Sequence, residues 1–347
     1  MRDNPILLNL LCCPTCRNKV KLYETENLSS DGHIIKGTLK CCNCGMVYPI
    51  QGGVPRFVPT KNVAADISAT VKGFGYEWKY VNKLIKDTHF ITEKSFLDLI
   101  YPIQPEYFKE KIVLDAGCGA GRFTYHAQQF GAKAIVGIDL SEAVDVAFQQ
   151  TRHCQNVIII QADISTFLPL QKCFDYIFSV GVLHHTPNPR GTFEAIVRLL
   201  KPEGGVSAWV YGRENNDWVI NFLNPIRLKL TSRLPRGILL ALSYFLAAPL
   251  WLITKSIYGP IGKIDSLAWL RKYLFYFDYL FYLSGVEYRT QTFIVFDVLV
   301  PTITKYTTYE DFKRWFSENK FKNLSITSRN GNSWRGFGIR SLLEDNL

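Results

Sequence analysis

The stretch that decides the fold is Ile112-Val-Leu-Asp-Ala-Gly-Cys-Gly-Ala-Gly-Arg-Phe-Thr124. An apolar run ends at Asp115, and three glycines follow at alternate positions before a helical pattern begins. Glycine is needed where the backbone takes a positive φ or approaches a ligand closely. The first N–H groups of a helix have no partner within it, so they face whatever lies at the turn. The stretch therefore predicts a strand, a tight turn and a helix start around a ligand.

The residues after Lys111 alternate between short apolar runs and helical patterns of about ten residues. Such alternation indicates an α/β fold with a doubly wound, Rossmann-like parallel sheet. A helix and a closing antiparallel pair of strands end the chain, which brings the expected sheet to seven strands. The predicted strands are 112–115, 133–138, 156–160, 174–180, 206–211, 324–327 and 334–339, and the predicted helices are 122–130, 142–152, 191–200 and 307–319.

Three aspartates, Asp115, Asp139 and Asp163, stand at or just past the ends of the first three predicted strands. In doubly wound sheets the ligand lies beyond the carboxyl ends of the strands, so all three should face one crevice. A carboxylate at position 139 can accept both hydroxyls of a ribose, and Asp163 can meet an adenine amino group. Arg122 stands where the dinucleotide pattern needs glycine, and the chain has no P-loop motif. The predicted cofactor is therefore an adenosine compound that is not a dinucleotide.

The motifs of this segment resemble, in order and spacing, those of class I S-adenosylmethionine-dependent methyltransferases. The similarity covers residues 111–212 and, more loosely, 307–341, and it is greatest to the group of ubiquinone and menaquinone methyltransferases. Besides the glycine turn, it rests on Gly137-Ile-Asp-Leu-Ser, Gln161-Ala-Asp-Ile, Leu199-Leu-Lys-Pro-Glu-Gly-Gly and the run from Phe174 to Thr186. The resemblance implies that S-adenosylmethionine is held by Asp115, Ala116, Gly117, Cys118, Gly119 and Gly121 at the methionine end, by Asp139 and Leu140 at the ribose, by Asp163 and Ile164 at the adenine, and by Val180 beside the sulfonium.

The resemblance implies an in-line displacement on the methyl group, in which alignment and desolvation supply most of the catalysis. His184 and His185 follow the fourth strand, close to the expected methyl. Either histidine could serve as the general base for a hydroxyl or an acidic carbon, because its ordinary pKa is near neutrality. The alternative is that the pair only shapes the loop. Cys118, inside the turn, is expected to pack and not to act as a nucleophile.

Six of the nine cysteines fall within residues 12–44. Cys13, Cys16, Cys41 and Cys44 form two Cys-x-x-Cys knuckles, and four thiolates suit tetrahedral zinc. All four ligands come from the protein, so the predicted zinc is structural. The odd count and the clustering argue against a secreted disulfide framework, and the only apolar stretch near the N-terminus is too short for a signal peptide. We expect a cytoplasmic protein, with association to a membrane left open.

The segment 39–57, with its Tyr-Pro-Ile and Gly-Val-Pro sequences, resembles a known zinc ribbon. That ribbon is the small activator protein that partners tRNA, rRNA and translation-factor methyltransferases. Residues 1–58 are therefore expected to form a small separate module, fused in this chain to its enzyme and folded by its metal.

Two further segments lie outside the ribbon and the cofactor-binding core. Residues 59–110 form a connector with an N-terminal helical pattern, in which Tyr76 and Trp78 either close over the cofactor or pack in the core. Residues 213–304 form an apolar helical insertion between the fifth and sixth strands, including 18 residues without a charge. Three interpretations compete for the insertion: a cap over an apolar substrate pocket, an interfacial membrane patch, and a true membrane span.

The sequence thus predicts five parts: ribbon 1–58, connector 59–110, cofactor core 111–212, cap 213–304 and closing segment 305–347. The leading hypothesis is a methyltransferase that acts on a small or lipid-linked metabolite, with peripheral membrane contact through the cap. The second hypothesis keeps the enzyme but makes the substrate RNA or a translation protein, supported by the ribbon and by the net charge of +10. The third is a non-catalytic scaffold, against which the intact aspartate set speaks.

Overall fold

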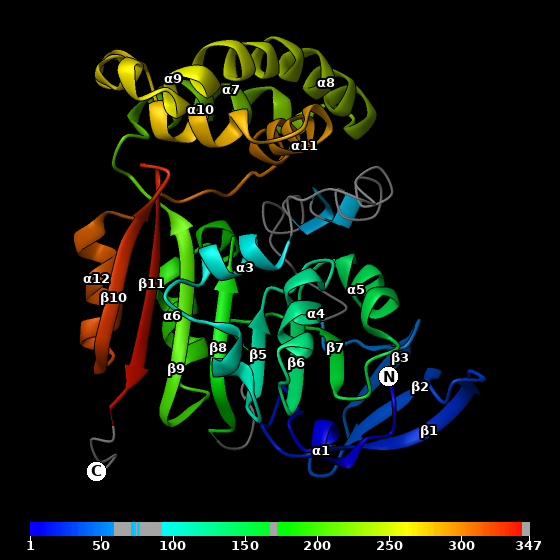
Figure 1. Cartoon of the computed structure of the whole chain (residues 1–347). Coiled ribbons are helices and arrows are strands. Elements are labelled where there is room, and N and C mark those ends of the chain that lie inside the picture. The colour runs from blue at the N-terminus through cyan, green and yellow to red at the C-terminus, as the bar shows by residue number, and fades with distance from the viewer. Residues whose placement is uncertain (59–70, 74, 77–91, 167–171, 342–347) are drawn as a thin grey trace.

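The computed structural model describes residues 1–58, 71–73, 75–76, 92–166 and 172–341. Its centre is a seven-stranded sheet in the order β10-β11-β9-β8-β5-β6-β7 (Figure 1). The strands from β5 to β9 pair in parallel, and β11 is antiparallel to both β9 and β10. The strands are β5 (Ile112–Ala116), β6 (Ala134–Asp139), β7 (Val157–Gln161), β8 (Phe174–Val180), β9 (Leu200–Tyr211), β10 (Phe321–Arg329) and β11 (Ser333–Arg340). The predicted doubly wound sheet is confirmed.

Helices cover both faces of this sheet, which explains why its central strands are apolar throughout. In β6, for example, every residue before Asp139 is buried. The helices α4 (Arg122–Gln129) and α5 (Ala143–Thr151) pack on one face, with α3 (Glu93–Leu99) beside α4. The other face carries α6 (Pro189–Val197) and α12 (Tyr309–Glu318). The order of the strands reverses between β5 and β8. A doubly wound sheet holds its ligand at this point of reversal, beyond the carboxyl ends of the strands.

The N-terminal segment folds into a small antiparallel sheet in the order β1-β2-β3-β4. Its elements are α1 (Pro5–Leu8), β1 (Val20–Leu28), β2 (Ile34–Cys41), β3 (Val47–Gln51) and β4 (Val54–Pro55). We refer to residues 1–58 as the ribbon. Figure 1 shows it below and beside β7, at one end of the large sheet.

The ribbon has a sheet of its own, and it also shares a hydrophobic core with the large sheet. Leu7, Leu11 and Phe57 belong to the same buried cluster as Val136 and Ile160 of the central strands. The ribbon covers the sheet face opposite α4 and α5, beneath β6 and β7. Its chain also runs along the edge strand, where the Phe57 N–H donates to the Gln161 carbonyl at 2.8 Å. The ribbon thereby protects an edge that would otherwise expose unpaired backbone groups.

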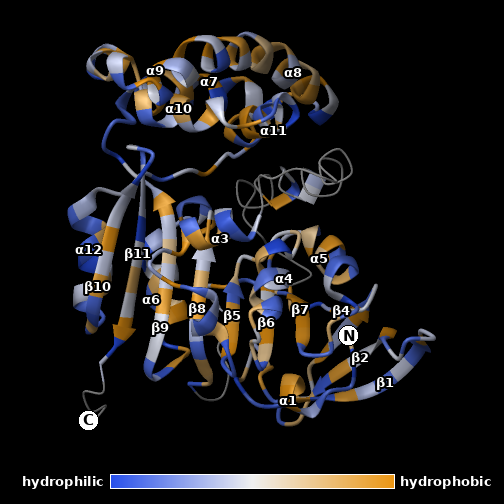
Figure 2. Ribbon diagram, in the orientation of Figure 1, coloured by the Kyte–Doolittle hydropathy of each residue, from blue (hydrophilic) through white to orange (hydrophobic). Residues whose placement is uncertain are grey.

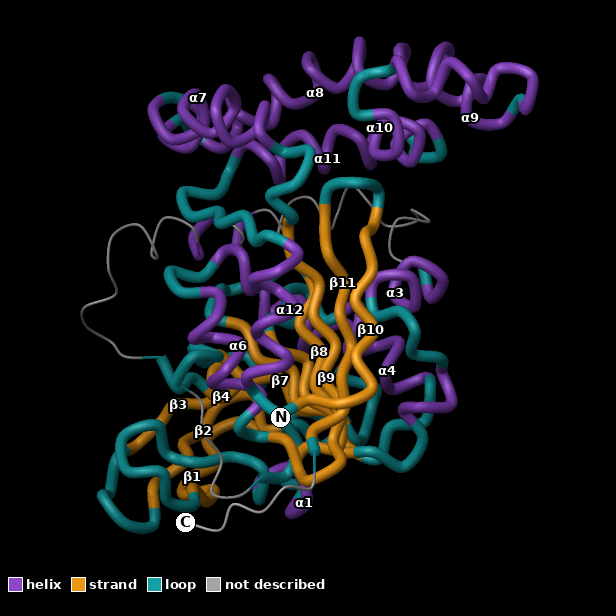
Figure 3. Tube along the Cα trace, turned by 90° about the vertical axis from the view of Figure 1, so that its left-hand side faces the viewer, coloured by secondary structure: helices purple, strands orange, loops and turns teal. Residues whose placement is uncertain are grey.

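The segment between β9 and α12 forms a layer of helices beyond the carboxyl ends of the parallel strands (Figures 1 and 3). We refer to residues 213–304 as the cap. Its α8 and α11 pack side by side through Leu239, Phe296, Leu299 and Val300. Its elements are η4 (Val219–Leu223), α7 (Asn224–Lys229), η5 (Thr231–Arg233), α8 (Arg236–Ile253), η6 (Thr254–Tyr258), α9 (Gly259–Lys263), η7 (Asp265–Tyr273), α10 (Phe277–Ser284) and α11 (Tyr288–Leu299).

The connector is described only in part. Tyr76 packs its ring 6.4 Å from that of Phe296, so it contacts the cap. Trp78 lies outside the described residues. The chain then passes through η2 (Pro105–Phe108) into β5. In α12, the Thr308 side chain accepts from the Asp311 N–H and caps the helix.

Candidate functional site

The four predicted zinc ligands lie together in the ribbon. The Sγ atoms of Cys13, Cys16, Cys41 and Cys44 are all within 4.8 Å of one another, with Cys16 and Cys41 at 3.3 Å and Cys13 and Cys44 at 3.6 Å. Tetrahedral zinc at its usual bond length to sulfur would separate thiolates by about 3.8 Å. The donor set therefore fits one zinc ion with every position filled by protein, which suits a structural metal.

Two neighbours of this cluster donate hydrogen bonds to its sulfur atoms. The Tyr48 hydroxyl lies 2.9 Å from the Cys13 Sγ, and the Asn43 N–H lies 3.4 Å from the Cys41 Sγ. Such donors stabilise thiolates and orient them toward a metal. The other two cysteines of the segment, Cys12 and Cys42, are outside the cluster, as the sequence predicts.

The glycine turn forms one wall of a cavity. The volume of this cavity is about 650 Å³, which is in the usual range of small-molecule sites. Gly117 has φ +95°, and a Cβ on it would come within 2.2 Å of the Val182 side chain. Gly121 has φ +79°, and a Cβ there would come within 2.9 Å of Ala147 on α5. Glycine is thus required at both positions, for the turn itself and for close packing around it. The turn brings the backbone of residues 117–120 to the cavity surface.

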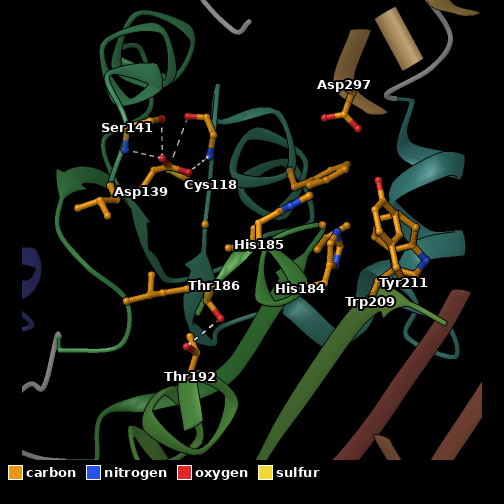
Figure 4. Close-up of a pocket in the computed structure, with 18 of the residues that line it drawn as sticks. Cys118, Asp139, Ser141, His184, His185, Thr186, Thr192, Trp209, Tyr211 and Asp297 are labelled. Carbon is orange, nitrogen blue, oxygen red and sulfur yellow. Dashed lines mark hydrogen bonds between the residues drawn. The ribbon is translucent and has the colours of Figure 1, made fainter. Parts of the chain in front are cut away.

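Asp139, at the end of β6, ties the turn to the adjacent strand (Figure 4). One of its carboxylate oxygens accepts from the Gly119 N–H at 2.9 Å. The other accepts from the N–H and the hydroxyl of Ser141 at 2.8 and 2.6 Å. Burial raises the pKa of this carboxyl above its ordinary value, although these hydrogen bonds act against the shift. The carboxylate is therefore held rigidly at the cavity, where two hydroxyl groups of a ribose could approach it.

The other predicted cofactor residues divide into two groups. The cavity wall includes Gly117, Cys118, Gly119, Leu140, Asp163, Ile164 and Val180. The wall does not include Asp115, Ala116 or Gly121. The Asp163 carboxylate accepts from the N–H and hydroxyl of Ser165, at 2.8 and 2.6 Å, which fixes its turn.

Asp115 does not line the cavity with Asp139 and Asp163, which differs from the expectation that all three aspartates face one crevice. Its side chain is buried and accepts from the Thr124 hydroxyl at 2.6 Å. Burial raises the pKa of this carboxyl to about 7. Asp115 therefore fastens the end of β5 to α4 behind the turn. Ala116 is buried in the core of the sheet, and Gly121 packs against α5.

The two histidines lie on the far side of the cavity from Asp139 (Figure 4). The His184 ring stacks on Tyr211 with centroids 3.9 Å apart, and neither ring nitrogen has a hydrogen-bond partner among the described residues. The His185 Nδ1 donates to the Ile303 carbonyl at 2.9 Å, which leaves the lone pair of the neutral ring on Nε2. Burial lowers the pKa of His184 far below its ordinary value and that of His185 to about 4. Both rings are neutral near pH 7, as a general base requires.

The cavity continues from the histidines to the cap, and sequence reasoning missed the residues there. Trp209 and Tyr211 project into it from the end of β9, where their alternation already signalled a shared face. Asp297 reaches down from α11 toward Tyr211 (Figure 4). A single carboxylate in an otherwise apolar helical run was the signal for it. Tyr282, Phe293 and Arg329 also line this end.

Comparisons with known proteins find similarity in two parts of the chain. Residues 114–208 match a family profile described as "Methyltransferase domain", and residues 4–53 match one described as "Trm112p-like protein". The chain is 33% identical over 121 residues to a tRNA U34 carboxymethyltransferase of Pseudoalteromonas translucida, which is 34% of this chain and 37% of the relative. It is 30% identical over 144 residues to a ubiquinone biosynthesis O-methyltransferase of Coxiella burnetii, which is 37% of this chain and 61% of the relative.

These alignments span less than two thirds of the length of either relative. Among solved structures, a magnesium protoporphyrin IX methyltransferase from Synechocystis PCC 6803 with bound S-adenosylmethionine aligns with 81% of this chain and 100% of its own. The two share 12% sequence identity, with a TM-score of 0.45. The resemblances noted in the sequence are thus confirmed: residues 4–53 are similar to the Trm112p-like family, and residues 114–208 are similar to the methyltransferase domain family.

Proposed function

We propose that this chain is an S-adenosylmethionine-dependent methyltransferase. The observation that carries the proposal is the placement of Asp139, whose carboxylate is held at the cavity by Gly119 of the glycine turn and by Ser141. A carboxylate at the end of this strand is suited to a ribose, and the exposed backbone of the turn is suited to the rest of an adenosyl ligand. Asp163 and Ile164 would hold the adenine, and Val180 would lie beside the methyl group.

The bound cofactor would supply an activated methyl group on its sulfonium. The protein would align an acceptor with that methyl and limit the access of water, since residues of the cap such as Phe293 line one end of the cavity. The cofactor would give up this methyl group with loss of its carbon–sulfur bond, and an acceptor that bears a proton would have to transfer that proton to a base. The Nε2 of neutral His185 is a base of suitable protonation state, and His184 is a second candidate.

Isothermal titration with S-adenosylmethionine and S-adenosylhomocysteine tests the cofactor. Each hydrogen bond to a charged group contributes about 1.5–3 kcal/mol, so Asp139→Ala should weaken binding of both compounds by at least about tenfold. Asp265→Ala, which changes an exposed carboxylate of the cap, is the matched control. Thermal melts of both variants show whether Asp139→Ala removes only contacts with the ligand or also destabilises the glycine turn. Binding that Asp139→Ala leaves unchanged would contradict the proposal, and no binding at all would favour the scaffold hypothesis.

The histidines require a separate experiment. His184→Phe keeps a flat ring against Tyr211 but removes both nitrogens, and His185→Gln keeps a donor for the Ile303 carbonyl. A base should affect kcat with little change in KM, whereas a residue that shapes the loop should affect binding and stability. Loss of kcat of about 100-fold or more in one variant, with cofactor affinity intact, would identify the base.

RNA is the acceptor class that the comparisons favour. The relative from Pseudoalteromonas translucida is named for a tRNA modification, and the ribbon matches the Trm112p-like profile. The net charge of +10 is also consistent with a polyanionic partner. These findings reverse the order predicted from the sequence, which placed a metabolite first. Binding of bulk tRNA that weakens steeply with salt, together with methyl transfer to it, would support RNA.

A small or lipid-linked acceptor is the second candidate, and it is favoured by the shape of the site. The acceptor end of the cavity lies under α11 and is lined by Trp209, Tyr211 and Phe293, with Asp297 among them. The relative from Coxiella burnetii is named for methylation in ubiquinone biosynthesis. Incubation with radiolabelled S-adenosylmethionine and either total RNA or a total lipid extract distinguishes the two classes by the fraction that gains label.

A further inference from the structure

The outer surface of the cap is apolar along the whole of α8. Every exposed residue of this helix is apolar or glycine, from Gly237 to Ile253. The three that protrude furthest are Ile238, Phe245 and Leu252, with exposed fractions of 57%, 75% and 61%. These three side chains define what we call the outer cap face. Figure 2 shows α8 on the side of the cap that faces away from the sheet.

The opposite side of α8 is fixed to the protein. Leu239, Ser243 and Ala247 are fully buried at a helical spacing, and Leu239 packs against Phe296 and Val300 next to α11. By length and composition alone, one helix of the described chain, residues 236–263, is long and apolar enough to cross a membrane. A crossing helix would have to leave the packing with α11, so the structure favours a helix that lies along a surface.

Other elements of the cap also expose large apolar side chains. Phe222 and Leu230 flank α7, and Trp269, Tyr273 and Phe275 come from η7 and the residues after it. Large aromatic side chains are enriched where a protein meets the headgroup layer of a bilayer, because one end of the ring is apolar and the other tolerates water. Exposed apolar residues that recur along one helix differ from the scattered single residues of ordinary surfaces.

The segment of the chain that contains the outer cap face carries mostly positive charge. Residues 218–275 contain eight arginines and lysines and one acidic residue, Asp265. The exposed cations are Lys229, Arg233, Lys255, Lys263 and Lys272, and no salt bridge involves them within the described part of the chain. Lys255 follows closely on α8, and Arg233 precedes it by three residues. An apolar face bordered by cations is complementary to a bilayer that contains anionic lipids.

We propose that the cap docks on an anionic lipid bilayer through α8, which lies in the plane of the interface with Ile238, Phe245 and Leu252 inserted. The cations beside it contact the lipid headgroups. Because α11 lies between α8 and the sheet (Figure 3), docking holds the acceptor end of the cavity next to the membrane. This inference concerns a surface outside the cofactor site, so it does not depend on the proposed reaction.

Vesicle flotation with the full chain tests the proposal. Vesicles of pure phosphatidylcholine are compared with vesicles of phosphatidylcholine and phosphatidylglycerol in a ratio of about 7:3, at low and high salt. The wild type should float with the anionic vesicles and less with the neutral ones, and salt should weaken but not abolish binding. The variant F245E/L252E should partition at least about tenfold more weakly. The matched control is Y23E/L28E on β1 of the ribbon, whose two side chains are similarly exposed and should be dispensable.

Any of the following results would overturn the proposal. The wild type could fail to bind either vesicle, or F245E/L252E could bind as the wild type does. The same variant could instead change the oligomeric state in analytical ultracentrifugation, or abolish RNA binding without affecting vesicles, in which case the face mates with a second copy or with nucleic acid. Retention in membranes after alkaline carbonate extraction would indicate a span. Unchanged affinity of F245E/L252E for S-adenosylhomocysteine shows that its cofactor site is intact.

Discussion

The ribbon and the cap are both attached to the same sheet, but they differ in which of their apolar surfaces are buried. The ribbon buries the apolar side chains that face the sheet, so that Leu7 and Phe57 join the cluster of Val136. The cap buries only the inner side of α8 and leaves the outer side, with Phe245, exposed. The difference shows that the ribbon completes the core of the fold, whereas the cap leaves an apolar surface exposed.

Removal of the ribbon's metal site should have the largest effect. Structural zinc contributes about 10–16 kcal/mol in small zinc-binding peptides, and the ribbon has little core of its own. Cys16→Ser should therefore abolish stoichiometric zinc binding, unfold the ribbon and expose the sheet beneath it. Elemental analysis and a thermal melt measure both effects. Cys42→Ser, an exposed cysteine between two ligands, should keep its zinc and its melting temperature. If the two variants had the same zinc content and the same melting temperature, the zinc assignment would be wrong.

The junction between ribbon and core should be the next most sensitive place. Phe148 of α5 is 4% exposed, contacts the ring of His33 and lies where a Cβ on Gly53 would clash at 2.3 Å. Phe148→Ala should lower the free energy of unfolding by about 3–5 kcal/mol. Denaturant unfolding measures this change. Tyr23→Ala, on the exposed side of the ribbon, should cost far less; a small loss from Phe148→Ala would mean that the ribbon is only loosely attached.

Acid pH should lower the stability of the junction between the ribbon and the core. The His33 Nε2 donates to the Arg152 carbonyl at 2.7 Å. Burial lowers the pKa of His33 below the ordinary histidine value of about 6.5. The charged groups around it are Arg2, Arg152, Asp31 and the amine of Met1. Below about pH 6.5 the unfolded chain binds the proton more tightly than the folded chain, so stability falls as pH falls.

The matching measurement is unfolding of the wild type and His33→Gln at about pH 7.5 and about pH 5.5, on either side of the ordinary histidine pKa. The wild type should lose more stability than the variant between these values. The cap has no histidine and should not contribute. Identical pH dependence of the two proteins would exclude His33 as a source of the acid effect.

Substitution on the outer cap face should have the smallest effect on stability. Phe245→Ala removes a side chain that is 75% exposed. Surface substitutions of this kind usually change the free energy of unfolding by no more than about 0.5 kcal/mol. The same change weakens vesicle binding if the cap docks on lipid. A large loss of stability would instead mean that Phe245 is buried in solution, and the contrast with Phe148 would disappear.

The sequence predicted the features that depend on local spacing. The glycine turn, the alternation of strands and helices, the placement of Asp139 after its strand and the two cysteine knuckles all follow from residues a few positions apart. For such features the backbone rules of glycine, the period of a strand and the geometry of a Cys-x-x-Cys turn leave few alternatives. The roles of Asp139, Asp163 and the histidines in binding and catalysis stay predictions, as does the cytoplasmic location.

Only the tertiary structure decided which surfaces meet. Asp115 and Asp139 stand at equivalent positions in the sequence, yet one turns inward to Thr124 and the other stays at the cavity. Asp297, far along the chain from the turn, reaches the same cavity because the cap folds back over the strand ends. The ribbon joined the core and the cap left one side uncovered for the same reason: burial depends on contacts between distant segments, which the local pattern of residues does not specify.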